Sequence, residues 1–172
     1  MVRMKRLWVP VLVGLLVAGV LGVGGGGAVA VEPRLTTASI MIPAAAFIPT
    51  TDNWDYSTGG NYLAVSGGNS GFSAPVSFPV PVVSIKKITL YAYDNTNLSA
   101  VCASPYRANP AAATQVLQGI ICTSGASTLD PQVLITTAIS PRRVNTAIHG
   151  AQLWVDLGPG TKFYGVKVTY TH

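Results

Sequence analysis

Ionisable side chains are scarce in this chain of 172 residues, which holds 11 Lys and Arg, 6 Asp and Glu, and 2 His. Charged residues make up 10% of the total, and Glu32 is the single glutamate. The two cysteines, Cys102 and Cys122, are too far apart for a CxxC motif. A structural zinc site needs four Cys or His ligands, usually in closely spaced pairs. The sequence therefore predicts neither a zinc site nor a haem site.

The sequence also contains few candidate residues for a hydrolytic active site. A Ser–His–Asp triad needs a histidine base, and only His149 and the terminal His172 are available. The chain has no G-x-S-x-G motif. A glycosidase needs two carboxylates about 5–10 Å apart, but all five aspartates lie in or beside predicted turns, where Asp bonds its own backbone. We therefore expect a non-enzymatic protein. The alternative is a small secreted hydrolase, either an esterase or a glycan-cleaving enzyme.

The formal net charge of +5 overstates the basic character of the folded part. Three basic residues lie among the first six positions, which leaves eight against six acids, or +2, in the rest of the chain. Lys86–Lys87 and Arg142–Arg143 are isolated pairs in the sequence rather than a basic stripe. Since nucleic-acid binding calls for clustered cations, we expect no nucleic-acid partner.

The N-terminus has the pattern of a secretory signal peptide. A basic segment, 1–6, precedes an apolar run at 7–23, and Ala28-Val29-Ala30 has the small-x-small pattern of a cleavage site. We expect cleavage after Ala30, a loose leader at 31–38 and a secreted protein with no membrane span. An uncleaved anchor is the alternative, because the apolar run is nearly long enough to cross a bilayer. Pro10 and the glycines at 24–27 weaken such a helix.

Regular alternation of apolar residues predicts an all-β fold for residues 39–172. Leu153, Val155 and Leu157 alternate with Gln152, Trp154 and Asp156, and similar patterns end the chain. Turn sequences separate the runs, as at 67–71, 95–97 and 158–161. We expect a single two-sheet antiparallel sandwich, jelly-roll-like, with an exposed loop at 48–60. It should have eight or nine strands near 39–43, 61–66, 72–78, 83–94, 98–106, 115–122, 132–140, 147–157 and 162–171.

Two segments carry a resemblance to known proteins: Ser84–Asn95 (SIKKITLYAYDN) and the closing GTKFYGVKVTY at 160–170. With these, residues 39–172 resemble a loose group of uncharacterised exported bacterial β-sandwich proteins. The resemblance implies a sandwich fold and export. It implies no activity.

The cysteine spacing predicts a cross-strand disulfide. Cys102 and Cys122 lie symmetrically about position 112, within an expected turn at 109–113. A hairpin centred there also places Ser104 opposite Ile120, and Tyr106 opposite Gln118. Directly opposed residues of an antiparallel pair approach to about 4.5 Å between Cα atoms, within reach of a disulfide. An oxidising compartment favours the bond; two free thiols are the alternative.

Oxygen-bearing side chains in two turns make calcium a candidate ligand. Asp94, Asn95 and Asn97 share one turn, and Asp52, Asn53 and Asp55 share another. Calcium takes six to eight oxygen ligands. Ordinary Asx turns, in which these side chains bond the local backbone, explain both turns equally well. We expect no other cofactor.

Aromatic side chains suggest a sugar-binding surface. Tyr91 and Tyr93 have the opposite parity to Leu90 and Ala92, so one set faces the core and the other faces outward. Trp54 and Tyr56 lie in the polar segment Asn53-Trp54-Asp55-Tyr56. Exposed rings beside Asn and Asp provide apolar contact and hydrogen bonds for a glycan or cell-surface ligand. The alternative is structural, because tyrosine is a common strand former whose ring covers the sheet.

Trp154 is better explained by structure. If 158–161 closes a four-residue hairpin, Trp154 lies opposite Gly165, and an aromatic ring opposite a strand glycine stabilises a sheet. The sequence thus favours a secreted carbohydrate-binding sandwich. A subunit that self-assembles by strand addition at exposed edges is another alternative.

Overall fold

The computed structural model describes residues 35–50 and 56–172, which fall within a single compact unit. The expected signal peptide at 1–30, Trp54, Asp52, Asn53 and Asp55 lie outside the described residues. Within them, no helix is both long and apolar enough to cross a membrane.

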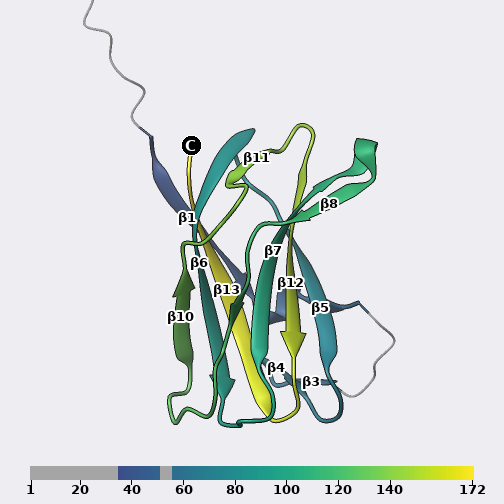
Figure 1. The fold of residues 1–172 in the computed structure, drawn as a ribbon, viewed down its shortest axis with the longest axis vertical. Helices are drawn as coiled ribbons and strands as arrows, with labels where there is room; N and C mark the ends of the chain where they lie inside the picture. Colours follow the sequence, from purple (N-terminus) through teal and green to yellow (C-terminus); the bar gives the residue numbers. More distant parts are fainter. Residues whose placement is uncertain (1–34, 51–55) are drawn as a thin grey trace, which may run out of the picture. The chain divides into compact units, whose positions relative to one another are not determined.

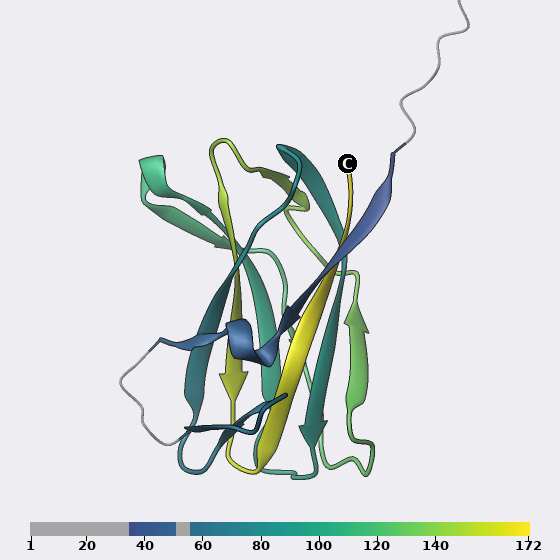
Figure 2. The ribbon, with the colours of Figure 1, turned by 180° about the vertical axis from the view of Figure 1, so that it is seen from behind.

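Two antiparallel sheets form the fold (Figures 1 and 2). The first sheet, as far as the described residues show, has seven strands: β1 (Thr37–Pro43), β3 (Tyr56–Thr58), β4 (Leu63–Val65), β6 (Val82–Asp94), β10 (Gln132–Thr136), β11 (Arg143–Asn145) and β13 (Thr161–Thr171). The second has six: β2 (Ile48–Pro49), β5 (Ser70–Val76), β7 (Val101–Asn109), β8 (Thr114–Leu117), β9 (Ile121–Cys122) and β12 (Gly150–Leu157). Two short 3-10 turns, η1 (Ala44–Ala46) and η2 (Pro110–Ala112), complete the described elements.

The all-β, two-sheet prediction is confirmed, but the expected strand count is too low, since the described residues form 13 strands. Residues 115–122 divide into β8 and β9 because Gln118 turns its side chain inward, where its Nε2 donates to the Pro141 carbonyl at 2.5 Å. The expected loop at 48–60 contains β2 and β3. β1 begins at Thr37, inside the expected leader, and pairs with the last strand.

The core lies between the sheets and follows the predicted alternation. On β6, Leu90 and Ala92 are fully buried, while Tyr91 and Tyr93 are half-buried on the outer face. On β12, Leu153, Val155 and Leu157 are buried. The parity of β6 and β12 is therefore as predicted.

The β6–β13 ladder contains two bulges that period-two reasoning missed. One extra residue, Tyr164, lies between the pairs Phe163–Ala92 and Gly165–Tyr91. Gly165 has φ +153°, and a Cβ there would lie 2.7 Å from the Ile42 carbonyl oxygen, so only glycine fits. The bulge turns Tyr164 outward, whereas Val166 faces the core.

The expected hairpin between the last two strands is wrong. Residues 158–161 do form a tight turn with Gly160 at φ +78°, but that turn carries the chain from the second sheet to the first. β12 pairs with β5 and β7, so Trp154 does not face Gly165. Its ring instead covers Gly71 of β5: a Cβ at Gly71 would lie 3.0 Å from the Trp154 ring. The aromatic-over-glycine pairing occurs, with a different glycine.

Candidate functional site

Four tyrosines gather on the outer side of the first sheet, at the ends of β6 and β13 and just before β4. We call this set, Tyr62, Tyr91, Tyr93 and Tyr164, the aromatic face. The bulge places Tyr164 and Gly165 together opposite Tyr91. Tyr62 meets Tyr164 edge-on, with ring centroids 6.1 Å apart and planes at 72°. Only Tyr91 and Tyr93 of this set were expected from the sequence.

One lysine and one aspartate order the aromatic face. Lys162 Nζ lies 5.3 Å from the centre of the Tyr62 ring and 5.0 Å from that of Tyr93, within cation–π range. The same ammonium lies 3.6 Å from Asp130 Oδ2. The Tyr164 hydroxyl donates a hydrogen bond to Asp130 Oδ1. Three of the four rings, Tyr62, Tyr93 and Tyr164, therefore have a charged neighbour within the face.

A hollow of about 450 Å³ opens in this face. Its lining combines two rings, one amide, one carboxylate and two apolar side chains: Met41, Asn61, Tyr91, Asp130, Pro131 and Tyr164. Ring faces provide apolar contact, while the amide and carboxylate provide donors and acceptors. That combination suits a neutral polyhydroxyl compound.

Burial and Asp130 both disfavour ionisation of the Tyr164 phenol. Burial first, and then the hydrogen bond and negative charge of Asp130, raise the pKa of the Tyr164 phenol well above its ordinary value. The phenol therefore keeps its proton at neutral pH. It donates to Asp130 and leaves its oxygen lone pairs for a ligand hydroxyl.

Tyr56 does not belong to this surface. Its ring packs edge-on against buried Phe72, with centroids 5.3 Å apart, and lies against the core. The Tyr56 side chain is thus half-buried, and its role as a ligand contact stays a prediction. Trp54 lies outside the described residues.

The turn proposed for calcium is held by protein hydrogen bonds. Asp94 is fully buried, and its Oδ1 accepts from the Thr96 backbone N–H at 3.0 Å, while Oδ2 accepts from the Thr123 hydroxyl at 2.5 Å. Asn97 Oδ1 accepts from the Ala126 N–H at 3.0 Å. Asn95 is exposed. Asp94 thus forms an Asx turn, whereas Asn97 joins this turn to the distant Ala126. No group of three or more His, Cys, Asp or Glu in the described part of the chain is arranged to hold a metal.

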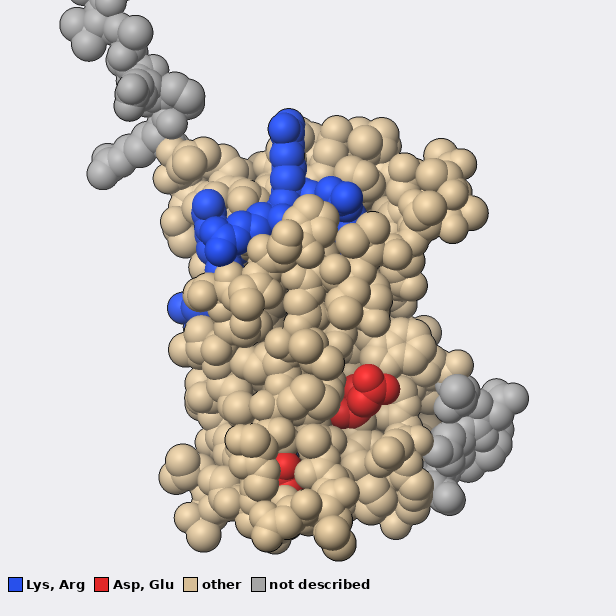
Figure 3. All heavy atoms as spheres, viewed as in Figure 1, with Lys and Arg blue, Asp and Glu red and all other residues tan. Residues whose placement is uncertain are grey.

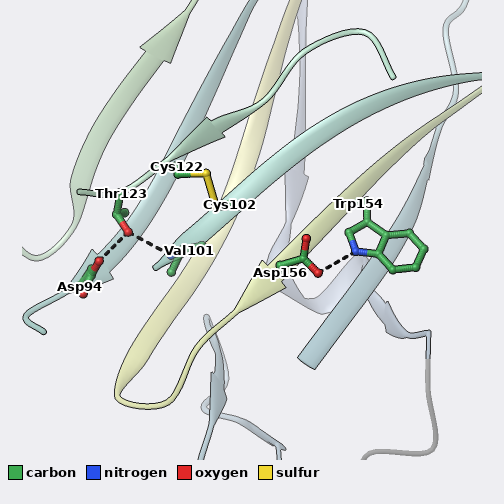
Figure 4. The surroundings of a disulfide bond; sticks show 7 residues. All are labelled: Asp94, Val101, Cys102, Cys122, Thr123, Trp154 and Asp156. Atoms are coloured by element: carbon green, nitrogen blue, oxygen red, sulfur yellow. Dashed lines mark hydrogen bonds between the residues drawn. A yellow bond between two sulfur atoms is a disulfide. The ribbon is translucent and has the colours of Figure 1, made fainter. Parts of the chain in front are cut away.

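The disulfide is confirmed. Cys102 of β7 lies directly opposite Cys122 of β9, with Cα atoms 4.1 Å apart and the sulfurs bonded (Figure 4). Further from the bond the predicted register is off by one, since Tyr106 faces Leu117 rather than Gln118. The irregular stretch between β8 and β9 absorbs the difference.

Figure 4 also shows the neighbours of this bond. Thr123, next to Cys122, accepts from the Val101 N–H at 2.9 Å and donates to Asp94. On the other side, the Trp154 indole N–H donates to Asp156 Oδ1 at 2.9 Å. These contacts give the disulfide and Trp154 structural roles.

The candidate base His149 faces its own loop. Its Nδ1 accepts from the Asn145 backbone N–H at 3.3 Å. Its surrounding hollow is lined by Asn109, Thr146 and Ile148 among other uncharged residues. Among the described residues, no carboxylate shares this hollow with His149.

Comparisons with known proteins place few constraints on this chain. No protein-family model and no curated protein matches it. Among solved structures, it is similar to a carbohydrate-binding module from the β-sandwich superfamily (13% identity, TM-score 0.39), over 80% of this chain and 54% of that one. This chain thus spans about half the length of that structure.

Two further structures are similar. One is the Podospora anserina GH26-CBM35 β-(1,4)-mannanase (9% identity, TM-score 0.36, 78% of this chain and 28% of that one). The other is TmCBM61 in complex with β-1,4-galactotriose (10% identity, TM-score 0.31, 79% and 87%). At these scores the likeness carries no argument about what this chain binds.

Proposed function

We propose that this protein is an exported, non-catalytic β-sandwich that binds a neutral glycan on its aromatic face. The observation that carries the proposal is the hollow where Tyr91 and Tyr164 lie beside Asn61 and Asp130. A sugar ring has apolar C–H faces and polar hydroxyl edges. The tyrosine rings match the first and the amide and carboxylate match the second.

The site is also preorganised. The contact of Asp130 with Tyr164, and those of Lys162 with the Tyr62 and Tyr93 rings, restrict these three side chains before any ligand arrives. Ordering side chains on binding costs about 0.5–1.5 kcal/mol each, and for these rings folding already meets part of that cost. Trp54 remains a proposed additional contact on sequence grounds.

Export is part of the same proposal. A disulfide joins the two cysteines, and such bonds persist in oxidising compartments. N-terminal sequencing of protein from the culture medium should begin at Val31 or within a few residues. An intact Met1 in a membrane fraction would refute the cleaved signal.

The binding test uses affinity electrophoresis through gels containing soluble mannan, galactan, xylan or β-glucan. We expect at least one polymer to retard the wild-type protein. Tyr91→Ala should weaken that binding about tenfold or more, equivalent to about 1.4 kcal/mol. Tyr106→Ala is the matched control, because Tyr106 is a half-buried strand tyrosine of the other sheet.

Two results would contradict the proposal. One is the absence of retardation by every neutral polymer. The other is an equal effect of Tyr91→Ala and Tyr106→Ala, which would show that the aromatic face is not the binding surface. Circular dichroism of each variant shows whether the fold is retained.

A further inference from the structure

Strand pairing brings together two basic pairs that are distant in the sequence. Arg143 of β11 lies opposite Ser84 of β6, and the Ile85 N–H donates to the Arg142 carbonyl at 2.9 Å. Arg107 of β7 reaches across from the second sheet and donates from Nη1 to the Arg143 carbonyl at 3.1 Å. The sequence-based expectation of isolated pairs is therefore wrong. Five cations form one cluster, which we call the basic band: Lys86, Lys87, Arg107, Arg142 and Arg143.

The second bulge of the β6–β13 ladder increases the charge density of this band. Lys86 is the extra residue, so Lys86 and Lys87 together face Thr169. Their buried neighbours Ile85 and Ile88 both point into the core. Regular alternation would have sent one lysine inward; the bulge keeps both outside.

The basic band has no acidic partners in the part of the chain that the structure describes. Among the described residues, the ion pair that forms lies on the aromatic face instead, where it joins Lys162 to Asp130. In the view of Figure 3, Lys and Arg gather across one end of the molecule, while Asp and Glu appear only in the other half. Unpaired cations of one sign create a local positive potential that attracts anions.

A hollow of about 460 Å³ adjoins the band between β6, β11 and the last strand. Lys86 and Arg143 contribute its cationic side chains, and Ser84 and Thr171 contribute hydroxyl groups. Leu35 and Val82 supply apolar walls. Cations beside hydroxyls and apolar surface can accept a sugar unit that carries a carboxylate.

We propose that the basic band binds an acidic polysaccharide, a chain of carboxylate-bearing sugars. Single exposed ion pairs contribute only about 0–1 kcal/mol, so a polymer that meets several cations at once is the ligand that gains most. No Phe, Tyr or Trp is among the described residues that line the hollow beside the band, where His172 supplies the one ring, so there is little surface on which nucleic-acid bases could stack. In Figure 3 the cations form a patch across one end of the molecule, a surface along which an extended chain can lie.

This surface is separate from the aromatic face, and the two are tested separately. The probe is alginate, a polyuronate, in a direct binding titration at about 50 mM salt, with uncharged dextran, duplex DNA and phosphatidylglycerol vesicles as comparison ligands. The variant is Lys86→Gln/Lys87→Gln/Arg143→Gln, which leaves the hydrogen-bonded guanidinium groups of Arg107 and Arg142 in place. Lys162→Gln is the control, a lysine at the other end of β13, where it lies opposite Tyr93.

We expect wild type to bind alginate but not dextran, with affinity falling as salt rises. The triple variant should lose tenfold or more, and both Lys162→Gln and Tyr91→Ala should bind alginate like wild type. No binding to alginate, or a loss caused equally by Lys162→Gln, would overturn the proposal. So would tighter binding to DNA or to vesicles than to alginate.

Discussion

Thr123 is a small residue on which the junction between the two sheets depends. Its side chain is 4% exposed, and its hydroxyl both accepts from the Val101 N–H and donates to the fully buried Asp94 carboxylate. Asp94 ends β6 in the first sheet, and Val101 begins β7 in the second. Thr123→Val keeps the side-chain shape and removes both bonds, so it measures the polar contribution with little change in packing.

The expected loss is large for an isosteric change. A buried N–H left without a partner costs about 1–3 kcal/mol, and a hydrogen bond to a charged group contributes about 1.5–3 kcal/mol. The Thr123 backbone N–H keeps its bond to the Val101 carbonyl. We therefore expect the free energy of unfolding to fall by about 3–5 kcal/mol.

Urea unfolding followed by tryptophan fluorescence and far-UV circular dichroism provides the measurement. With a slope of about 2 kcal/mol/M, the midpoint should fall by roughly 2 M. Thr136→Val is the matched control, because the Thr136 hydroxyl accepts from the Ala138 N–H at an exposed site; we expect a change within about 0.5 kcal/mol. Equal, small effects of the two variants would refute the role of Thr123 as a link between sheets.

Two further predictions concern the disulfide and Tyr164. Cys102→Ala/Cys122→Ala opens a loop with a sequence separation of 20, so stability should fall by about 3 kcal/mol in the chain-entropy model and the melting temperature by about 10 °C; an unchanged melting temperature would contradict this. In alkaline absorbance titration, Tyr164 should ionise last, and Tyr164→Phe should remove that step. Because folding raises this pKa, its stabilising effect is complete below about pH 10, the unfolded value, and is lost as pH rises through the folded value; a titration unaltered by Tyr164→Phe would contradict the assignment.

The sequence correctly predicted those structural features that depend only on residues close together in the chain. The outward parity of Tyr91 and Tyr93 follows from alternation within one strand. The Cys102–Cys122 pairing follows from the symmetry of a single connection. Gly160 takes the positive φ expected of its turn.

The pairing of strands that are distant in the sequence could not be predicted from such local patterns. The turn at 158–161 has the same local sequence whether the chain folds back into one sheet or crosses to the other. In the structure the turn crosses to the other sheet, and β12 lies between β5 and β7. Likewise, nothing near Arg142 or Lys86 in the sequence indicates that β11 pairs with β6.

The two bulges explain why only some residues of each candidate surface could be predicted from the sequence. Each inserts one residue into the β6–β13 ladder, Tyr164 on one strand and Lys86 on the other. Each places two consecutive residues on the outer side, where alternation would give one. A bulge interrupts ladder hydrogen bonds and is retained at functional sites where it redirects a side chain. Here one bulge brings Tyr164 beside Asp130, and the other brings Lys86 beside Arg143. The irregularities of a single strand pair therefore shape both proposed surfaces, the aromatic face at one end of the ladder and the basic band at the other.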